Sequence, residues 1–337
     1  MSLSALFIGG TGRISTSCVR EAVRQGLDVT VLNRGKTAER ALPPEVEFVT
    51  GDIGDPQSVR AALGDRTFDA VVNWVNFTPE QVQRDIDLFA GRTGQYLFIS
   101  SASAYQTPPE RLPVTESTPL KNPFWQYSRD KIACEELLVR AYREDDFPAT
   151  IIRPSHTYDE TMLPFDGGWT VVERMRAGKP VIVHGDGTSL WTITHARDFA
   201  VGFTGLLGQA AAIGEAFHIT GDEAPTWNQI FTWVAEAAGV PEPHLVHVAT
   251  DAIAAANHDW GAGLLGDKMH SMVFDNSKVK RLVPEFGQRT TPYRLGAREV
   301  IAWYDAHPEH QTSEAKAHIV MDWLAEHYSP RAVLTMD

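Results

Sequence analysis

The chain has 337 residues, of which 43% are hydrophobic and 22% are charged. This composition is that of a globular protein with a large core, and it excludes extensive disorder. The net charge of −13 argues against a broad nucleic-acid or anionic-membrane surface, because such surfaces carry a basic excess. The N-terminus lacks a signal-peptide pattern, and no segment approaches the ~20 apolar residues of a membrane span, so we expect a cytoplasmic protein. Cys18 and Cys134 form no CxxC pattern and are expected to be free thiols.

In the first half of the chain, short apolar runs alternate with amphipathic stretches. The runs predict strands at residues 5–8, 29–32, 46–50, 70–73, 96–100 and 150–153. The stretches between them predict helices at residues 17–25, 56–63, 80–90 and 127–142. Strands that alternate with helices predict an α/β fold, with a Rossmann-type doubly wound parallel sheet covered by helices on both faces.

After Pro154 this alternation ends, because prolines and glycines interrupt short elements. We expect helices over residues 227–238, with Thr226 as the N-cap, and over residues 292–306. The predicted domains are a Rossmann domain in residues 1–155, with interleaved later segments, and a smaller C-terminal lobe mainly in residues 156–306. Residues 307–337 form a tail of unknown role, with a short helical pattern around residues 317–327.

The first strand leads directly into a glycine-rich turn, Gly9-Gly-Thr-Gly12-Arg-Ile-Ser15. Glycines let the backbone approach a pyrophosphate, and the following helix N-terminus offers free N–H donors and a partial positive charge. Since the turn follows a strand and opens a helix, it favours a dinucleotide-binding loop over a plain tight turn. We assign to this cofactor site the residues Gly9, Thr11, Gly12, Arg13 and Ile14.

The ends of the next strands indicate which dinucleotide binds. Asn33 stands where an acidic residue would bind the ribose 2′-hydroxyl of NAD, and Arg34 and Lys36 could neutralise a 2′-phosphate. We therefore expect NADP to be preferred over NAD; the alternative is that both cations are solvated loop charges. After the third strand, Asp52 and Ile53 are placed to flank the adenine, while Asp55 is the better cap for the following helix. We also assign Asn73, at the end of the fourth strand, to the cofactor site.

Tyr127 and Lys131 lie four residues apart, on one face of a predicted helix. A neighbouring ammonium lowers the pKa of a phenol from ~10 toward the working pH, which suits proton exchange with a secondary alcohol or ketone. The fifth strand ends in Ser100-Ser101-Ala-Ser103, and a hydroxyl at this edge could bind the reacting oxygen. The three serines compete for that role, and turn formation is the alternative.

These motifs together with Ile152-Arg-Pro154 resemble the extended short-chain dehydrogenase/reductase superfamily, above all its NAD-dependent epimerase/dehydratase family. Later motifs, such as His184-Gly-Asp-Gly187, extend the resemblance to about residues 3–305. The resemblance implies that Tyr127 is the acid/base, that Lys131 binds the nicotinamide ribose and tunes Tyr127, and that Ser101 is the catalytic hydroxyl. The cofactor residues that it adds are Ser100, Pro154 and Ser155.

Three departures from the family pattern narrow the reaction. Ala102 and Ser103 follow Ser101 where 4,6-dehydratases carry an Asp-Glu pair, so we do not expect dehydratase activity. Trp191 stands where nucleotide-sugar enzymes usually carry an arginine for the diphosphate; it could stack on a sugar ring, or it is a core aromatic. Arg197 or Arg174 could compensate for the missing arginine. His156 replaces an asparagine of many relatives. The expected substrate contacts are Ser103, Trp125, His156 and Trp191. The closely spaced histidine pairs 244/247 and 307/310 lack a third ligand, so we expect no metal.

The sequence thus predicts an NAD(P)-dependent oxidoreductase or epimerase that acts on a secondary alcohol or ketone of a small sugar-like substrate. Epimerisation and net redox chemistry both stay open, although NADP preference favours net reduction. The alternative is a non-catalytic dinucleotide-sensing or RNA-associated protein on the same fold, because residues 33–36 are similar to a segment of chloroplast stem-loop RNA-binding relatives. Relatives often dimerise through the helices expected at residues 80–90 and 127–142, so a homodimer is a further expectation.

Overall fold

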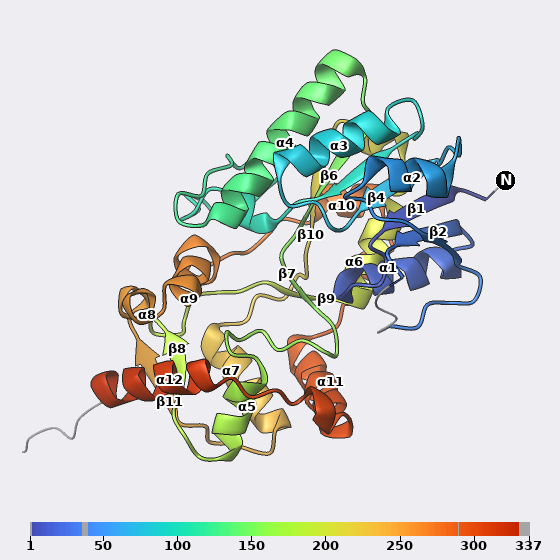
Figure 1. Cartoon of the computed structure of the whole chain (residues 1–337). Helices are drawn as coiled ribbons and strands as arrows, with labels where there is room; N and C mark the ends of the chain where they lie inside the picture. Colours follow the sequence, from blue (N-terminus) through green and yellow to red (C-terminus); the bar gives the residue numbers. More distant parts are fainter. Residues whose placement is uncertain (1, 36–39, 289, 330–337) are drawn as a thin grey trace, which may run out of the picture. The chain divides into compact units, whose positions relative to one another are not determined.

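The computed structural model describes residues 2–35, 40–288 and 290–329 (Figure 1). Contacts between residues divide the chain into two compact units. Unit 1 consists of Met1–Asp159, Thr192–Asp222 and Phe274–Thr291. Unit 2 consists of Glu160–Trp191, Glu223–Val273 and Pro292–Asp337. Each unit is therefore assembled from segments that lie far apart in the sequence.

A seven-stranded sheet forms the centre of unit 1, and all its neighbouring strands pair in parallel. In spatial order the strands are β10 (Ala216–Ile219), β6 (Ala149–Pro154), β5 (Tyr96–Ile99), β4 (Ala70–Asn73), β1 (Ser4–Ile8), β2 (Asp28–Asn33) and β3 (Glu47–Thr50). The strand order changes direction at β1, and ligands of such sheets bind at this point, beyond the carboxyl ends of the strands. The predicted α/β fold with a Rossmann-type doubly wound sheet is confirmed.

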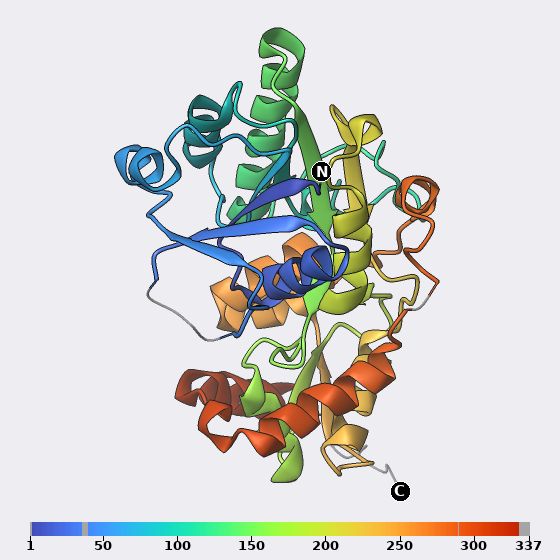
Figure 2. The same cartoon turned by 90° about the vertical axis from the view of Figure 1, so that its right-hand side faces the viewer.

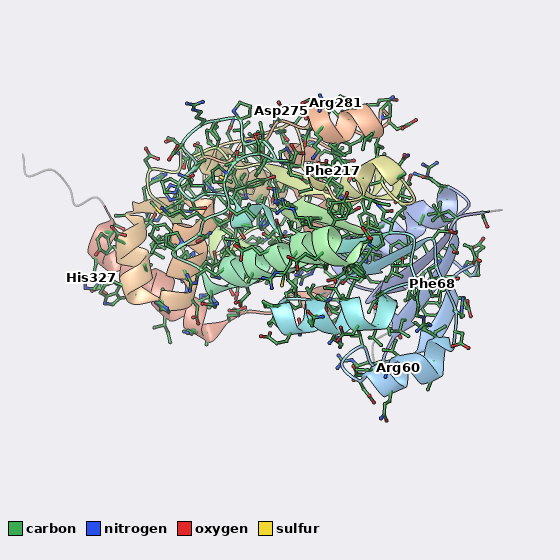
Figure 3. The ribbon with its side chains drawn as sticks, turned by 90° about the horizontal axis from the view of Figure 1, so that it is seen from above. Arg60, Phe68, Phe217, Asp275, Arg281 and His327 are labelled. Atoms are coloured by element: carbon green, nitrogen blue, oxygen red, sulfur yellow. The ribbon has the colours of Figure 1, made fainter. Side chains whose placement is uncertain are left out.

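Helices cover both faces of this sheet, which explains why its central strands are apolar on both sides. One face carries α1 (Arg13–Arg24) and α6 (Ala196–Gly205); the other carries α2 (Pro56–Leu63), α3 (Pro79–Phe89) and α4 (Gln126–Asp145) (Figure 2). Residues of β1 alternate between the two layers: Ala5 and Phe7 join the core beside α1 and α6, whereas Leu6 and Ile8 join the opposite core. On that second face α3 and α4 lie side by side (Figure 3).

Local interactions determine where the helices of unit 1 begin. Asp55 accepts the N–H of Gln57 and caps α2, as predicted. Helix α1 begins at Arg13, four residues before the predicted start, because Gly12 is its N-cap and Ser15 closes the first turn. Unit 1 is completed by the parallel strands β7 (His156–Tyr158) and β9 (Ile193–His195), by α10 (Ser277–Leu282), and by short 3-10 turns at Ala102–Ala104 and Ala210–Ala212.

Unit 2 contains a parallel pair of strands, β8 (Val181–His184) and β11 (Leu245–Val248). Its helices are α5 (Trp169–Arg176), α7 (Trp227–Ala237), α8 (Thr250–Ala256), α9 (His258–Gly263), α11 (Tyr293–Ala306) and α12 (Ala315–Tyr328), with short turns of helix at Leu264–Lys268 and Pro308–His310. Thr226 caps α7 as predicted. Helix α12 lies in the tail and packs on β8 and β11, where Arg174 donates to Asp322 at 2.6 Å. Within the described ranges, no helix has the length and apolar character needed to cross a membrane.

Candidate active site

The glycine turn after β1 has the geometry of a cradle for a phosphate group. Gly9 has a φ of +79°, and a Cβ at this position would lie 2.8 Å from Cγ1 of Val75, so only glycine fits. The Ser15 hydroxyl accepts the N–H of Gly12 at 2.8 Å and donates to the Gly9 carbonyl at 2.9 Å, which holds the turn closed. The first backbone bond within α1 runs from the N–H of Thr16 to Gly12, so the N–H groups of the first turn have no partner inside the helix. These donors and the bare glycine backbone fit the diphosphate of a dinucleotide.

The carboxyl ends of β1, β2, β3 and β4 border a cavity of about 490 Å³ in unit 1. Seven residues predicted for the cofactor line it: Gly9, Thr11, Gly12, Asn33, Arg34, Asp52 and Ile53. The other lining residues, which the sequence analysis did not assign to the cofactor, are Ile8, Leu32, Gly35, Gly51, Gly54, Val75, Gln81 and Arg84. The fold therefore brings the glycine turn and the ends of the next two strands to one hollow, whose volume suits a small-molecule ligand.

Two polar residues shape the wall of this cavity by binding their own loops. Asn33 Oδ1 accepts the N–H of Gly35, and Asp52 Oδ1 accepts the N–H of Gly54, both at 2.9 Å. Arg34 is exposed at the cavity and brings a positive charge next to the uncharged Asn33. Lys36, the second cation predicted here, lies outside the described residues.

Lys131 is a buried cation at the ends of β4 and β5. Its side chain is on α4 and only 2% exposed, and its ammonium donates to the carbonyls of Asn76 and Ile99, both at 2.7 Å. The ammonium also lies over the rings of Phe77 and Phe98, at 4.8 and 4.9 Å. Burial lowers the pKa of Lys131 to about 8, because the neutral carbonyls and rings around it replace water only in part.

Tyr127 lies one helical turn before Lys131, as the spacing predicted. The Lys131 ammonium is 5.7 Å from the centre of the Tyr127 ring. The ring also lies 4.9 Å from that of Trp125 and 6.4 Å from that of Phe77. Tyr127 and Trp125 are half-buried, and Phe77 is 47% exposed. The phenol thus sits between aromatic rings and beside a cation, with access to solvent.

The three serines that follow β5 have different surroundings. Ser100 is buried, and its hydroxyl donates to the carboxylate of Glu135 at 2.5 Å. Ser103 is also buried and accepts the hydroxyl of Ser128 at 2.8 Å. Ser101 is half-buried, and its hydroxyl lies 2.9 Å from that of Ser103. Among the three, Ser101 is therefore the serine whose hydroxyl is most open to a ligand.

Several other predicted cofactor residues have side chains engaged within unit 1. Asn73 donates to the carboxylate of Asp85 at 2.6 Å, and its own oxygen accepts the N–H of Val75. Ser155 donates to the carbonyl of Thr192 at 2.7 Å. The remaining predicted positions are Arg13, which is exposed, Ile14, which is half-buried, and Pro154, which is buried.

The four expected substrate contacts are spread over both units. Ser103 and Trp125 lie next to Ser101 and Tyr127 in unit 1, and the half-buried His156 begins β7. Trp191 belongs to unit 2, is 2% exposed and lies 5.6 Å from the ring of Trp227. The surroundings of Trp191 correspond to the core aromatic that the sequence left open as its alternative. The described residues contain no group of His, Cys, Asp or Glu suited to hold a metal.

The sequence analysis missed several groups of this site. The carbonyls that hold Lys131 could not be recognised, because every residue has one. Gln81 and Arg84 come from α3, and no local motif links that helix to the glycine turn. Glu135 follows Lys131 by four residues, so its place on the same helix face was a signal that could have been used.

Comparison with known proteins identifies the family of this chain. Residues 5–220 match the NAD dependent epimerase/dehydratase family. UDP-glucose 4-epimerase of Lactobacillus helveticus is 34% identical over 168 residues, which are 45% of this chain and 51% of that protein. The 2′-dehydrokanamycin reductase of Streptomyces kanamyceticus is 27% identical over 308 residues, 90% of this chain and 84% of the relative. A chloroplast stem-loop binding protein of Arabidopsis thaliana is 28% identical over 254 residues, 72% of this chain and 65% of the relative. The chain thus spans about half the length of the first relative and most of the second.

Solved structures share the fold. Epimerase Mth375 of Methanothermobacter thermautotrophicus has a TM-score of 0.74 at 16% identity, over 92% of this chain and 94% of that one. The dTDP-glucose 4,6-dehydratase of Bacillus anthracis, in complex with NAD, has a TM-score of 0.71 at 18% identity, over 91% and 98%. The fold agrees with the match in sequence, which covers more than half of the chain, and the resemblance noted from the motifs is confirmed. The protein belongs to the NAD dependent epimerase/dehydratase family.

Proposed function

We propose that the protein is an NAD(P)H-dependent oxidoreductase that reduces a ketone of a small sugar-like molecule. The observation that carries this proposal is the buried Lys131 ammonium beside the half-buried Tyr127 ring. A phenol next to an unpaired ammonium is suited to give up a proton, and a carbonyl oxygen that becomes an alkoxide needs one. A paired lysine would favour the phenolate less strongly, because a carboxylate would cancel its field.

Each residue of the proposed site has one task in the reduction. A nicotinamide dinucleotide bound at the glycine turn would supply the hydride for the carbonyl carbon. The Tyr127 hydroxyl donates its proton to the carbonyl oxygen, so that the alcohol forms and a phenolate remains. Lys131 stabilises this phenolate, and the Ser101 hydroxyl donates a hydrogen bond that orients the carbonyl. Solvent then returns the proton to Tyr127.

The cofactor is proposed to bind in the cavity beside the glycine turn. Gly9, Gly12 and the first turn of α1 would hold the diphosphate, and Asp52 and Ile53 would border the adenine. Arg34 lies on the wall of the same cavity and would bind a ribose 2′-phosphate. Its charge supports NADP over NAD, since no acidic side chain directly follows β2 to bind a 2′-hydroxyl.

Net reduction is favoured over epimerisation by the extent of the matches. The relative named 2′-dehydrokanamycin reductase aligns with 90% of this chain, whereas the UDP-glucose 4-epimerase aligns with 45%. Trp191 stands where the family resemblance implies a diphosphate-binding arginine, so we propose as substrate a sugar-like ketone without a nucleotide. Elimination of water is not part of the proposal, because Ala102 and Ser103 carry no carboxylate.

The test is a screen of sugar ketones with NADPH and with NADH. The measured quantity is the loss of nicotinamide absorbance as the reduced cofactor is oxidised. We expect NADPH to be consumed with a free keto-sugar, and Tyr127→Phe to lose nearly all turnover while it still binds NADPH. Tyr142→Phe, on an exposed tyrosine of the same helix, is the matched control and should keep full activity. Turnover by Tyr127→Phe would overturn the proposed acid role. Conversion of UDP-sugars without net NADPH consumption would instead support epimerisation.

The chloroplast stem-loop binding relative supports a second candidate function, which is RNA association. The net charge of −13 opposes it, because RNA binding by phosphate contacts needs basic surface. A gel shift with a stem-loop RNA at two salt concentrations separates the two functions. A salt-sensitive shift together with inactivity toward every ketone would favour the RNA-associated protein.

A further inference from the structure

Arg84 is a cation at the cofactor cavity that the proposed function leaves without a task. It belongs to α3, lines the cavity of about 490 Å³ together with Gly9 and Gly12, and has a side chain that is 18% exposed. Arg34 reaches the same cavity from the end of β2 and is exposed. The Arg84 guanidinium is therefore largely shielded from water although it borders the cavity. Hydrogen bonds to a ligand could replace the water contacts that it has lost.

The guanidinium is held in place by a buried polar cluster. Its Nε and Nη2 donate to Asp85 Oδ1 at 3.2 and 3.0 Å, and Nη2 also donates to Asn76 Oδ1 at 2.8 Å. Asp85 is fully buried and receives further hydrogen bonds from Asn73, Asn76 and Tyr96. Asp85 acts as an acceptor toward all of these groups, as an ionised carboxylate does. Arg84 is thus oriented before any ligand arrives, which lowers the entropy lost on binding.

One edge of the guanidinium is left for a ligand. The bonds to Asp85 and Asn76 use Nε and Nη2, and within the described residues Nη1 has no hydrogen-bond partner. Arg84 donates to Oδ1 of Asp85, whereas Asn73, Asn76 and Tyr96 donate to Oδ2. The guanidinium is thus a fork with one side anchored on Asp85 and Asn76 and the other side open to the cavity.

The strand order indicates which part of a dinucleotide Arg84 would meet. Helix α3 follows β4, which lies beside β1 and its glycine turn, and Val75 after β4 would touch a Cβ placed on Gly9. Arg34 follows β2, on the other side of β1 and next to β3. The two arginines therefore approach the cavity from opposite sides of the glycine turn, with Arg84 on the side away from the strand ends proposed for the adenosine.

We propose that Arg84 binds the diphosphate of the dinucleotide through Nη1, opposite the N-terminus of α1. This inference rests on the proposed dinucleotide site and adds to it a side chain that complements the backbone donors. It also links the cofactor to Lys131, because Asn76 accepts from Arg84 through its side chain and from Lys131 through its carbonyl. In this proposal Arg34 binds the 2′-phosphate of the dinucleotide and Arg84 binds its diphosphate.

The test compares Arg84→Gln with wild type in calorimetric titrations of the full chain with NADP⁺, NAD⁺, ADP and adenosine. We expect the Kd of NADP⁺, NAD⁺ and ADP to rise by a similar factor, about 10- to 100-fold, since a charged hydrogen bond is lost. Adenosine, which has no phosphate, should bind wild type and variant alike. Arg60→Gln is the matched control, because Arg60 lies on α2, is exposed and points away from the ribbon in Figure 3; its Kd values should stay unchanged.

Two other results would overturn the inference. A loss confined to NADP⁺ would place Arg84 at the 2′-phosphate, and an unchanged Kd for ADP would make it a purely structural partner of Asp85. Arg84→Lys covers the case in which the glutamine variant unfolds, because lysine keeps the charge while losing the fork: its Kd for ADP should be higher than that of wild type, while its Kd for adenosine stays unchanged. If wild type binds no dinucleotide at all, the proposed function itself fails, which is a distinct outcome.

Discussion

We expect the lowered pKa of the buried Lys131 to make stability and the proposed ketone reduction change with pH in opposite directions. Burial lowers this pKa from 10.5 to about 8, while the unfolded chain keeps the ordinary value. Between these two values the unfolded state binds more protons than the folded state, so stability rises with pH. At neutral pH the charged lysine costs the fold about 3 kcal/mol, and this cost disappears as the pH passes from about 8 to about 10.5.

The perturbation that isolates this effect is Lys131→Met. The substitution also leaves the carbonyls of Asn76 and Ile99 without their donor, but that loss does not depend on pH. The difference in unfolding free energy between wild type and variant should therefore shift by about 2 kcal/mol in favour of wild type between about pH 7 and about pH 9.5. Lys121→Met, on an exposed lysine, controls for the loss of one positive charge and should give a flat difference.

The assay is urea unfolding followed by circular dichroism and tryptophan fluorescence, with kcat/KM measured over the same range. Since kcat/KM reports the free enzyme, we expect the kcat/KM of ketone reduction to fall above about pH 8 as Lys131 loses its proton. A pH-independent difference between wild type and Lys131→Met would refute the argument that burial is the main cause of this lowered pKa. A parallel rise of stability and kcat/KM would refute the proposed role of the charged form.

Three further changes test other parts of the site. Arg34→Gln should weaken NADP⁺ binding about tenfold and leave NAD⁺ unchanged in fluorescence titrations, since one charged phosphate contact is lost; equal loss for both would contradict the 2′-phosphate assignment. Ser101→Ala should lower kcat about a hundredfold at unchanged NADPH affinity, as expected for a donor to the reacting oxygen, and an unchanged kcat would exclude that role. Glu135→Gln should lower the free energy of unfolding by about 3 kcal/mol, because it leaves Arg153 buried and unpaired; a loss well under 1 kcal/mol in urea would show that water reaches the pair.

The sheet of unit 1 was predictable because its strands are short apolar runs between amphipathic stretches. The strand at Ala70–Asn73 and the helix at Pro56–Leu63 coincide with the predicted residues, and Asp55 caps that helix as its side chain suggested. The start of α1 was predicted too late. Residues 13–16 show no apolar periodicity, so the start of the helix depends on local hydrogen bonds of Ser15 to Gly9 and Gly12, which the apolar pattern does not reveal.

Lining residues of the cofactor cavity were predictable where a short segment of the chain contains the whole sequence motif. Glycines after the first strand and polar residues after the second and third strands belong to such local patterns, and they do line one cavity. Arg84 carries no local signal, because its relation to the cavity depends on how α3 packs after β4. Asn73 shows the converse: its position suggested a ligand contact, whereas its side chain is used to bind the buried Asp85.

Arg153 and Lys131 are two buried cations near the end of β5. Their different partners explain why Arg153 suits a structural role and Lys131 a chemical one. Arg153 meets the carboxylate of Glu135 at 2.6 Å, and although burial acts to lower the pKa of Arg153, this carboxylate raises it above the ordinary value. The hydrogen-bond partners of Lys131 are neutral carbonyls at similar distances, and burial outweighs the more distant charge of Glu135, so the pKa of Lys131 falls to about 8. A cation that a carboxylate contacts directly acts less strongly on a neighbouring phenol. Lys131 keeps more of its field, at the cost of stability, and in the proposed reaction this field acts on Tyr127.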